Sequence, residues 1–189
     1  RGLANAHLCT LMLKACRSSE EQRQLVDVKM PKFGVAPNVV TYNTLVGMLM
    51  MEGDAEAARR VVERDMPAAG VQPNKVTKEA LALPEFALQK RRTALLSQWL
   101  KQGGAAATDA AWALFESLGE RGLADAHLCT VVLKACHSSE EQRQLVDVTM
   151  PKFGVAPNVV TYTSLVGMLM IEGDAEAARR VVERDMPAA

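Results

Sequence analysis

Apolar residues recur at helical spacing through most of the chain. Between Val40 and Met51 they stand at positions 42, 45, 46, 49 and 50, which form one stripe of a helix. A second helical stripe runs from Ala55 to Met66, after a break at Gly53-Asp54. No segment shows a convincing strand pattern, so helices are predicted throughout. We expect the following side chains, and their copies 120 residues later, to be buried between paired helices: Leu45, Leu49, Ala58, Val61 and Val62.

The pattern is duplicated. Residues 1–69 recur as residues 121–189 and differ at eight positions, namely 5, 11, 12, 17, 29, 43, 44 and 51. A turn signal that ends in Pro-Asn punctuates both copies, as in Gly34–Asn38, Gly70–Asn74 and Gly154–Asn158, and weaker forms close at Asn5 and Asp125. Gly allows a left-handed helix end, Pro stops the helix, and Asn or Asp caps the next one. The final Asn or Asp of each turn signal is called its closing residue. Most intervals between successive closing residues are about 35 residues long, which indicates an array of helix-pair repeats.

One interval between closing residues is longer by about 15 residues than the repeat period. We expect an insert at residues 75–88, interrupted by Pro84, followed by a helix from about Ala87 to Gln102. Thr108 or Asp109 is expected to cap a last helix that runs to the next turn signal. The chain as a whole is therefore predicted to be all-α, with about ten or eleven helices stacked in antiparallel pairs.

Composition and charge narrow the possible functions. Alanine, valine, leucine and methionine are abundant and the aromatic content is only 4%, which favours closely packed helices over sheets. The net charge is zero, so no bulk attraction to nucleic acid is expected and any such site must be local. The basic residues Lys90, Arg91, Arg92 and Lys101 form one local cluster that could contact phosphate, although a solvated helix face explains it equally well.

No catalytic or metal-binding pattern is present in the sequence. Cys9 and Cys16 recur as Cys129 and Cys136, and their spacing of seven places each pair on one helix face as small buried side chains. The run Ser18–Glu21 is typical of a helix start rather than of a nucleophile. We expect no enzyme, no cofactor and no metal, and no apolar run approaches the ~18 residues that cross a membrane. Because the chain begins and ends inside repeated segments, we expect it to be part of a longer array.

The opening run Val39–Val46, the break at Gly53-Asp54 and the close Gly70–Asn74 resemble the pentatricopeptide repeat. Residues 39–74 match that motif nearly end to end. The tetratricopeptide repeat has about the same period but lacks both the opening run and the Pro-Asn close, so it is the weaker alternative. On this resemblance the expected units are 6–38, 39–74, 89–125, 126–158 and 159–189, with the insert at 75–88.

The resemblance implies a right-handed α-solenoid whose concave face binds single-stranded RNA, with roughly one nucleotide per repeat. In the family two side chains read each base, one early in the first helix and one at the close of the motif. The reading pair in the best unit is Asn43 with Asn74, which in the family favours a pyrimidine. Thr163 replaces Asn43 in the second copy and, with a closing Asn, would favour adenine. Val40 and Val160 match the apolar position that packs against base faces.

Further reading pairs follow when the same positions are counted back from each closing residue. One of these pairs, Thr93 with Asp125, is a guanine-type combination in the family. His7 and His127 stand where Val40 stands in the best unit, so packing against a base is not expected there. The additional pairs are Thr10 with Asn38, Thr130 with Asn158, and Thr93 with Asp125.

Two functions are compatible with these features. The first is a sequence-selective adaptor for single-stranded RNA that acts in processing, stability or translation of mitochondrial or plastid transcripts. The alternative is a structural helical-repeat subunit of a large organellar assembly, such as a ribosome or membrane complex, whose concave face holds protein. A continued series of Asn, Asp, Thr and Ser at reading positions favours RNA. The two histidines and the neutral charge favour the scaffold.

Overall fold

A computed structural model describes residues 6–186, with side chains from Leu8 onward. The described residues form no strand and eleven helices, when each π-helical turn (η) is counted together with the α-helical segments that it adjoins, which confirms the all-α prediction. The chain divides after Arg91 into two compact units, called unit 1 and unit 2 below.

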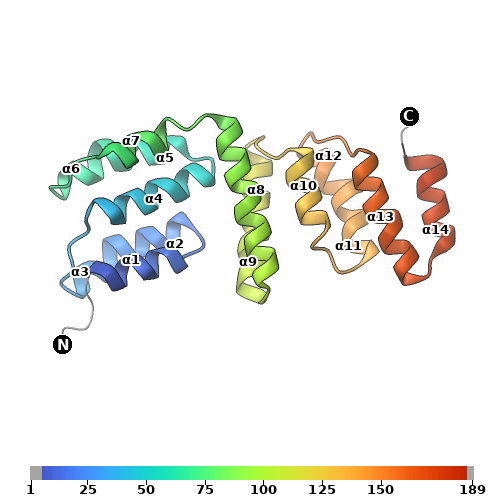
Figure 1. Ribbon diagram of the computed structural model, residues 1–189, viewed down its shortest axis with the longest axis horizontal. Helices are drawn as coiled ribbons and strands as arrows, with labels where there is room; N and C mark the ends of the chain where they lie inside the picture. The colour runs from blue at the N-terminus through green and yellow to red at the C-terminus, as the bar shows by residue number, and fades with distance from the viewer. Residues whose placement is uncertain (1–5, 187–189) are drawn as a thin grey trace. The chain divides into compact units, whose positions relative to one another are not determined.

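Unit 1 contains the first two helix pairs and the start of a third (Figure 1). Within it α4 contacts α1, α2, α5 and α7, so α4 lies at the centre of the unit. Its elements are α1 (Ala6–Ala15), α2 (Ser19–Gln24), η1 (Leu25–Lys29), α3 (Met30–Lys32), α4 (Val39–Met51), α5 (Ala55–Arg60), η2 (Val61–Asp65), α6 (Met66–Ala68) and α7 (Lys75–Leu81).

Helix α8 (Glu85–Gln102) spans the division between the units, and unit 2 continues from it. Within unit 2 the helix α13 contacts α10, α11 and α14, as α4 contacts its neighbours in unit 1. The remaining elements are α9 (Ala105–Glu120), α10 (Ala126–Leu133), α11 (Ser139–Gln144), η3 (Leu145–Thr149), α12 (Met150–Lys152), α13 (Val159–Glu172), α14 (Ala175–Arg180) and η4 (Val181–Asp185).

The closing residues of the turn signals cap the helices that follow them. Asn38 caps α4, Asn74 caps α7, Asp125 caps α10 and Asn158 caps α13, each through a side-chain oxygen that accepts from backbone N–H groups. Asn5 lies outside the described residues. Helix α7 begins inside the segment expected to be an insert, with the same kind of capping box as α4.

The cap expected at Thr108 or Asp109 is wrong. Helix α9 begins at Ala105, and its N-cap is Gly104, which has a φ of 84°. Residues 105–107 are all alanine, the strongest helix former, so the helix extends back to the glycine that ends the preceding connection.

The segment from Ala55 to Met66 is not the uninterrupted α-helix expected there. It contains a π-helical turn, η2, in which the Met66 N–H donates to the Val61 carbonyl five residues earlier. The next residue, Pro67, has no N–H, and its ring would crowd the carbonyl four residues before it in a regular helix. A wider turn relieves that conflict. The same arrangement precedes Pro31 and Pro151.

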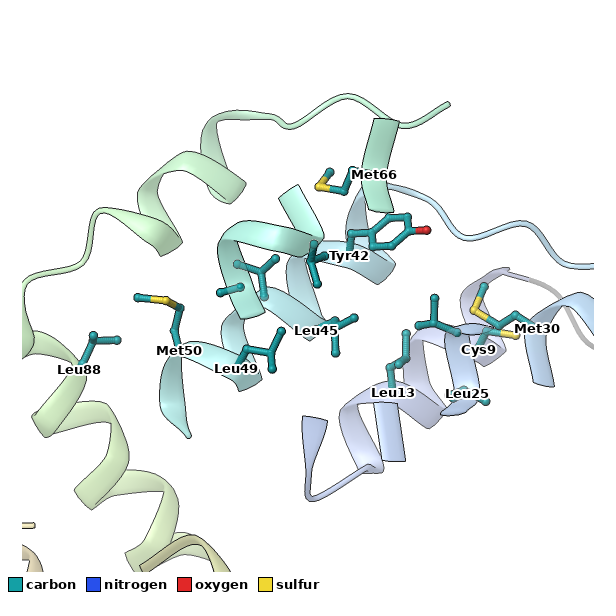
Figure 2. Packing of buried hydrophobic residues seen from close by; sticks show 14 residues of the cluster. Cys9, Leu13, Leu25, Met30, Tyr42, Leu45, Leu49, Met50, Met66 and Leu88 are labelled. Atoms are coloured by element: carbon teal, nitrogen blue, oxygen red, sulfur yellow. The ribbon is translucent and has the colours of Figure 1, made fainter. Parts of the chain in front are cut away.

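The core of unit 1 lies between α4 and the helices that contact it (Figure 2). Leu45 and Leu49 of α4 pack there, with Leu13 and Leu25 on one side and Met50 and Leu88 on the other. Four of the five expected core residues are buried in each unit: Leu45, Leu49, Ala58 and Val61, with their copies Leu165, Leu169, Ala178 and Val181.

The prediction is wrong for Val182, whose side chain is 51% exposed. Its copy Val62 is half-buried and packs against the core cluster of unit 1. In unit 1 helix α7 covers α4 and α5, and the described residues of unit 2 include no counterpart of α7.

All four cysteines are free thiols. The expectation that each pair shares one helix face is wrong, because Cys16 and Cys136 lie beyond the ends of α1 and α10. Cys9, Cys129 and Cys136 are buried and Cys16 is half-buried. Burial raises the pKa of the Cys129 and Cys136 thiols to about 11 each. Within the described residues no group of His, Cys, Asp and Glu could hold a metal ion, and no helix there is long and apolar enough to cross a membrane.

Candidate nucleic-acid interface

The two side chains predicted as the best reading pair lie in direct contact in unit 1. Asn43 stands in the second turn of α4, and Asn74 caps α7, which packs beside α4. The Nδ2 of Asn43 donates a hydrogen bond to the Oδ1 of Asn74 at 3.2 Å. The fold thus joins residues that are 31 positions apart in the sequence.

A third residue, Thr77, completes this contact and was missed by the sequence reasoning. Its backbone N–H donates to Asn74 Oδ1 at 3.0 Å, and its hydroxyl donates to Asn43 Oδ1 at 2.5 Å. The same hydroxyl oxygen lies 3.1 Å from Asn74 Oδ1 and accepts from the Asn74 backbone N–H at 3.1 Å. The Thr three residues after each closing Asn could have indicated this role, because Thr41 and Thr161 recur at the same place.

The network determines which polar groups the pair presents to solvent. Both Oδ1 atoms accept hydrogen bonds inside the protein, whereas the Nδ2 of Asn74 and the second proton of Asn43 Nδ2 have no partner among the described residues. Asn74 is exposed and Asn43 half-buried. The pair therefore offers hydrogen-bond donors, which complement acceptors such as the ring carbonyls of a pyrimidine.

Exposed valines stand beside this polar pair. Val40 in the first turn of α4 is 47% exposed, and Val76 in the first turn of α7 is 55% exposed. Val76 follows Asn74 by two residues, as Val40 follows Asn38, but its segment was assigned to the insert and the residue was not singled out. Val160 of α13 in unit 2 is similarly exposed. Exposed apolar side chains at this register could pack against base faces.

The threonine pairs differ from the asparagine pair. Thr130 and Thr163 donate their hydroxyl protons to the carbonyls of Ala126 and Val159, four residues earlier in their own helices, at 2.7 Å each. Thr130 and Asn158 share no hydrogen bond among the residues described. The hydroxyl oxygens of Thr130 and Thr163 can still accept a hydrogen bond. Thr10 is half-buried on α1, which contacts the helix capped by Asn38, and Thr93 is half-buried on α8.

Capping also determines what each closing residue can offer. The Oδ1 atoms of Asn38 and Asn158 accept from the N–H groups and hydroxyls of the following Thr residues, which leaves the Nδ2 donors for a ligand. Asp125 Oδ1 accepts from Leu128 N–H at 2.7 Å, which leaves the second carboxylate oxygen as an acceptor. A closing Asn therefore presents donors, and a closing Asp presents an acceptor.

Comparison with known protein families identifies the repeat. A family model described as the pentatricopeptide repeat domain matches residues 5–51, 25–81 and 144–185, together more than half of the chain. The chain belongs to the pentatricopeptide repeat family. No curated protein matches it. Pentatricopeptide repeats are helical hairpins that form solenoids, and members of the family are generally RNA-binding adaptors without catalysis and commonly organellar.

A basic groove of about 360 Å³ extends the candidate interface in unit 2 of this pentatricopeptide repeat chain. Ser97 and Lys101 of α8 line it together with Lys134 at the end of α10. On α8 the residues 93, 97 and 101 share one helix face, and on α10 the residues 130 and 134 do, so the groove continues the faces that carry Thr93 and Thr130. Neither lysine has a carboxylate partner in the described part of the chain.

The basic cluster expected on α8 is only partly available to a ligand. Arg92 is fully buried, because it lies on the helix face that carries the core residues Leu88 and Leu96. Lys90, Arg91 and Lys101 are exposed. Helix α8 therefore leaves three of the four expected charges exposed.

Proposed function

We propose that this chain is a sequence-selective adaptor for single-stranded RNA, acting in organellar RNA processing, stability or translation. The observation that carries the proposal is the hydrogen-bonded Asn43–Asn74 pair, which offers donors to solvent between the exposed Val40 and Val76. Rigid donors beside apolar surface suit a single-stranded base, which has both an edge to read and a face to stack.

The expected repeat units extend the same role along the array. We propose that residues 6–38, 39–74, 89–125, 126–158 and 159–189 are the units, and that α7 opens a further first helix within residues 75–88. The proposed reading residues beyond the best pair are Thr10 with Asn38, Thr93 with Asp125, Thr130 with Asn158, and Thr163, with Val160 against the base.

Such a protein acts by occupation rather than by chemistry. A bound strand has its bases held at the reading positions and is kept from pairing with other RNA or from contact with nucleases. The chain has no net positive charge, but Lys101 and Lys134 provide positive charge locally at the groove. These two lysines would contact the phosphates of the RNA.

The test is the exchange of Asn43 for Thr, the residue found in the second copy. Binding is measured against single-stranded RNAs that differ at one nucleotide. Asn43→Thr should move the preferred base from a pyrimidine to adenine at a single position while affinity for the best RNA stays similar. A wrong base should cost about 1–3 kcal/mol, by analogy with base reading in DNA.

Thr44→Ser is the matched control, because position 44 also differs between the copies, as Ser164, and its hydroxyl bonds only to the Val40 carbonyl of its own helix. This variant should keep the original preference. If the unaltered chain binds no RNA of the panel, or has no base preference at any position, the RNA proposal is wrong.

The scaffold alternative retains one specific observation in its favour. His127 is exposed on the first turn of α10, where the best unit has a valine. A protein partner seated on these first helices would block RNA, so competition between the RNA panel and such a partner distinguishes the two functions.

A further inference from the structure

We propose that Thr77 is a positioning residue that fixes which atoms the Asn43–Asn74 pair presents to a base. This inference rests on the proposed RNA-binding function. Thr77 itself is fully buried, so it does not touch the ligand and acts only through the two amides.

The argument starts from the symmetry of an asparagine side chain. The amide has nearly the same shape after a half-turn, so only its hydrogen-bond partners decide whether Oδ1 or Nδ2 faces outward. The Thr77 hydroxyl donates to Asn43 Oδ1 at 2.5 Å and thereby holds that oxygen inward. Asn74 is fixed separately, because its Oδ1 accepts from the Thr77 N–H as the helix cap.

A turned Asn43 amide would lose both of its partners. Its oxygen would then face Asn74 Oδ1, which is 3.2 Å from the present Nδ2, and two acceptors would oppose each other. Because Thr77 has no exposed surface, water cannot easily replace its hydroxyl. The three residues therefore form a closed set of hydrogen bonds with one stable orientation.

Unit 2 shows the same cap without this added function. Thr161 is also buried and donates its hydroxyl to Asn158 Oδ1 at 3.2 Å. The neighbouring reading residue there is Thr130, whose hydroxyl donates to the Ala126 carbonyl of its own helix. Thr161 thus completes only a helix cap, whereas Thr77 completes a cap and also orients a reading amide.

The experiment uses Thr77→Val, which keeps the shape of the side chain and removes the hydroxyl. Base discrimination at the RNA position read by Asn43 should fall by about tenfold, toward equal binding of all four bases, because both amide orientations become available. Thr77→Ser should restore the discrimination. Thr161→Val is the matched control: it removes a cap hydroxyl of the same kind and should leave that position unchanged.

A second measurement needs no RNA. The side-chain amide protons of Asn43 should exchange with solvent several-fold faster in Thr77→Val than in the unaltered chain or in Thr161→Val, as followed by NMR on labelled protein. Unchanged exchange overturns the inference. So does a Thr77→Val variant that keeps its base discrimination or that weakens all RNAs equally. Absence of RNA binding in the unaltered chain contradicts the proposed function alone, and the exchange measurement still decides the role of Thr77.

Discussion

Gly119 and Phe153 interlock in unit 2, and this contact yields a sharp stability prediction. A Cβ built on Gly119 of α9 would lie 2.3 Å from two carbons of the Phe153 ring, far inside ordinary contact. The ring also packs edge-on against Phe115, with 5.4 Å between centroids. Because one ring makes both contacts, its displacement from residue 119 would disturb its packing against Phe115.

Gly119→Ala should therefore destabilise the chain although alanine is the better helix former. Alanine gains at most about 1 kcal/mol of helix propensity over glycine. Overpacking typically costs about 1–3 kcal/mol, and a disturbed aromatic pair a further ~0.5–1.5 kcal/mol. The net expectation is a loss of about 1–3 kcal/mol in the free energy of unfolding, measured by urea titration followed by far-UV circular dichroism.

Gly167→Ala is the matched control, because Gly167 lies within α13 and a Cβ there would meet nothing within 4 Å. That variant should be more stable by up to about 1 kcal/mol. In a Phe153→Ala background, Gly119→Ala should no longer lower the free energy of unfolding, because the ring that it would meet is absent. The reasoning is refuted if Gly119→Ala stabilises the unaltered chain as Gly167→Ala does.

Two further outcomes are expected. Leu45→Ala should cost about 2–5 kcal/mol in unfolding experiments because Leu45 is fully buried, whereas truncation of the exposed Val182 should stay within about 0.5 kcal/mol; equal costs would contradict the burial described for unit 1. Lys101→Gln with Lys134→Gln should lower the slope of log affinity against log salt by about 1.4, the value for two phosphate contacts on a single strand. The repeat-related pair Lys32→Gln with Lys152→Gln removes the same charge away from the groove, and an equal loss of slope there would refute a local phosphate site.

The features that local chemistry determines could be predicted from the sequence. In a Pro-Asn close the proline prevents the preceding helix from continuing and the asparagine caps the next helix. Asn38, Asn74 and Asn158 are such caps in the structure. The helical stripe identified Leu45 and Val61 as buried because burial follows the period of the helix. The pairing of Asn43 with Asn74 came from the family resemblance, and the structure brings the two side chains into contact.

Features that depend on tertiary packing could not be predicted in the same way. The π-helical turn before Pro67 is an exception, because its cause is the proline itself, and the hydrophobic pattern alone did not indicate it. Gly119 has no pattern of its own, and its importance depends on Phe153, which lies more than thirty positions away. The copy of that phenylalanine, Phe33, is 54% exposed, and the described residues include no counterpart of α9 to pack against it.

The closing residue of each repeat caps a helix and, under the proposed function, also reads a base, and both roles restrict its identity. Its side chain must offer an oxygen to the start of the next helix, which selects Asn, Asp, Ser or Thr. Once that oxygen accepts its hydrogen bonds, Asn has only its NH₂ group left and Asp only its second oxygen, as at Asn74 and Asp125. An exchange of Asn for Asp therefore reverses the group offered to a base and preserves the cap. One of the eight differences between the duplicated segments is this exchange, Asn5 against Asp125, and another replaces the proposed reading residue Asn43 by Thr163. Under the proposed function an exchange at position 43 would vary base preference, and Asn43 lies outside the core cluster of unit 1.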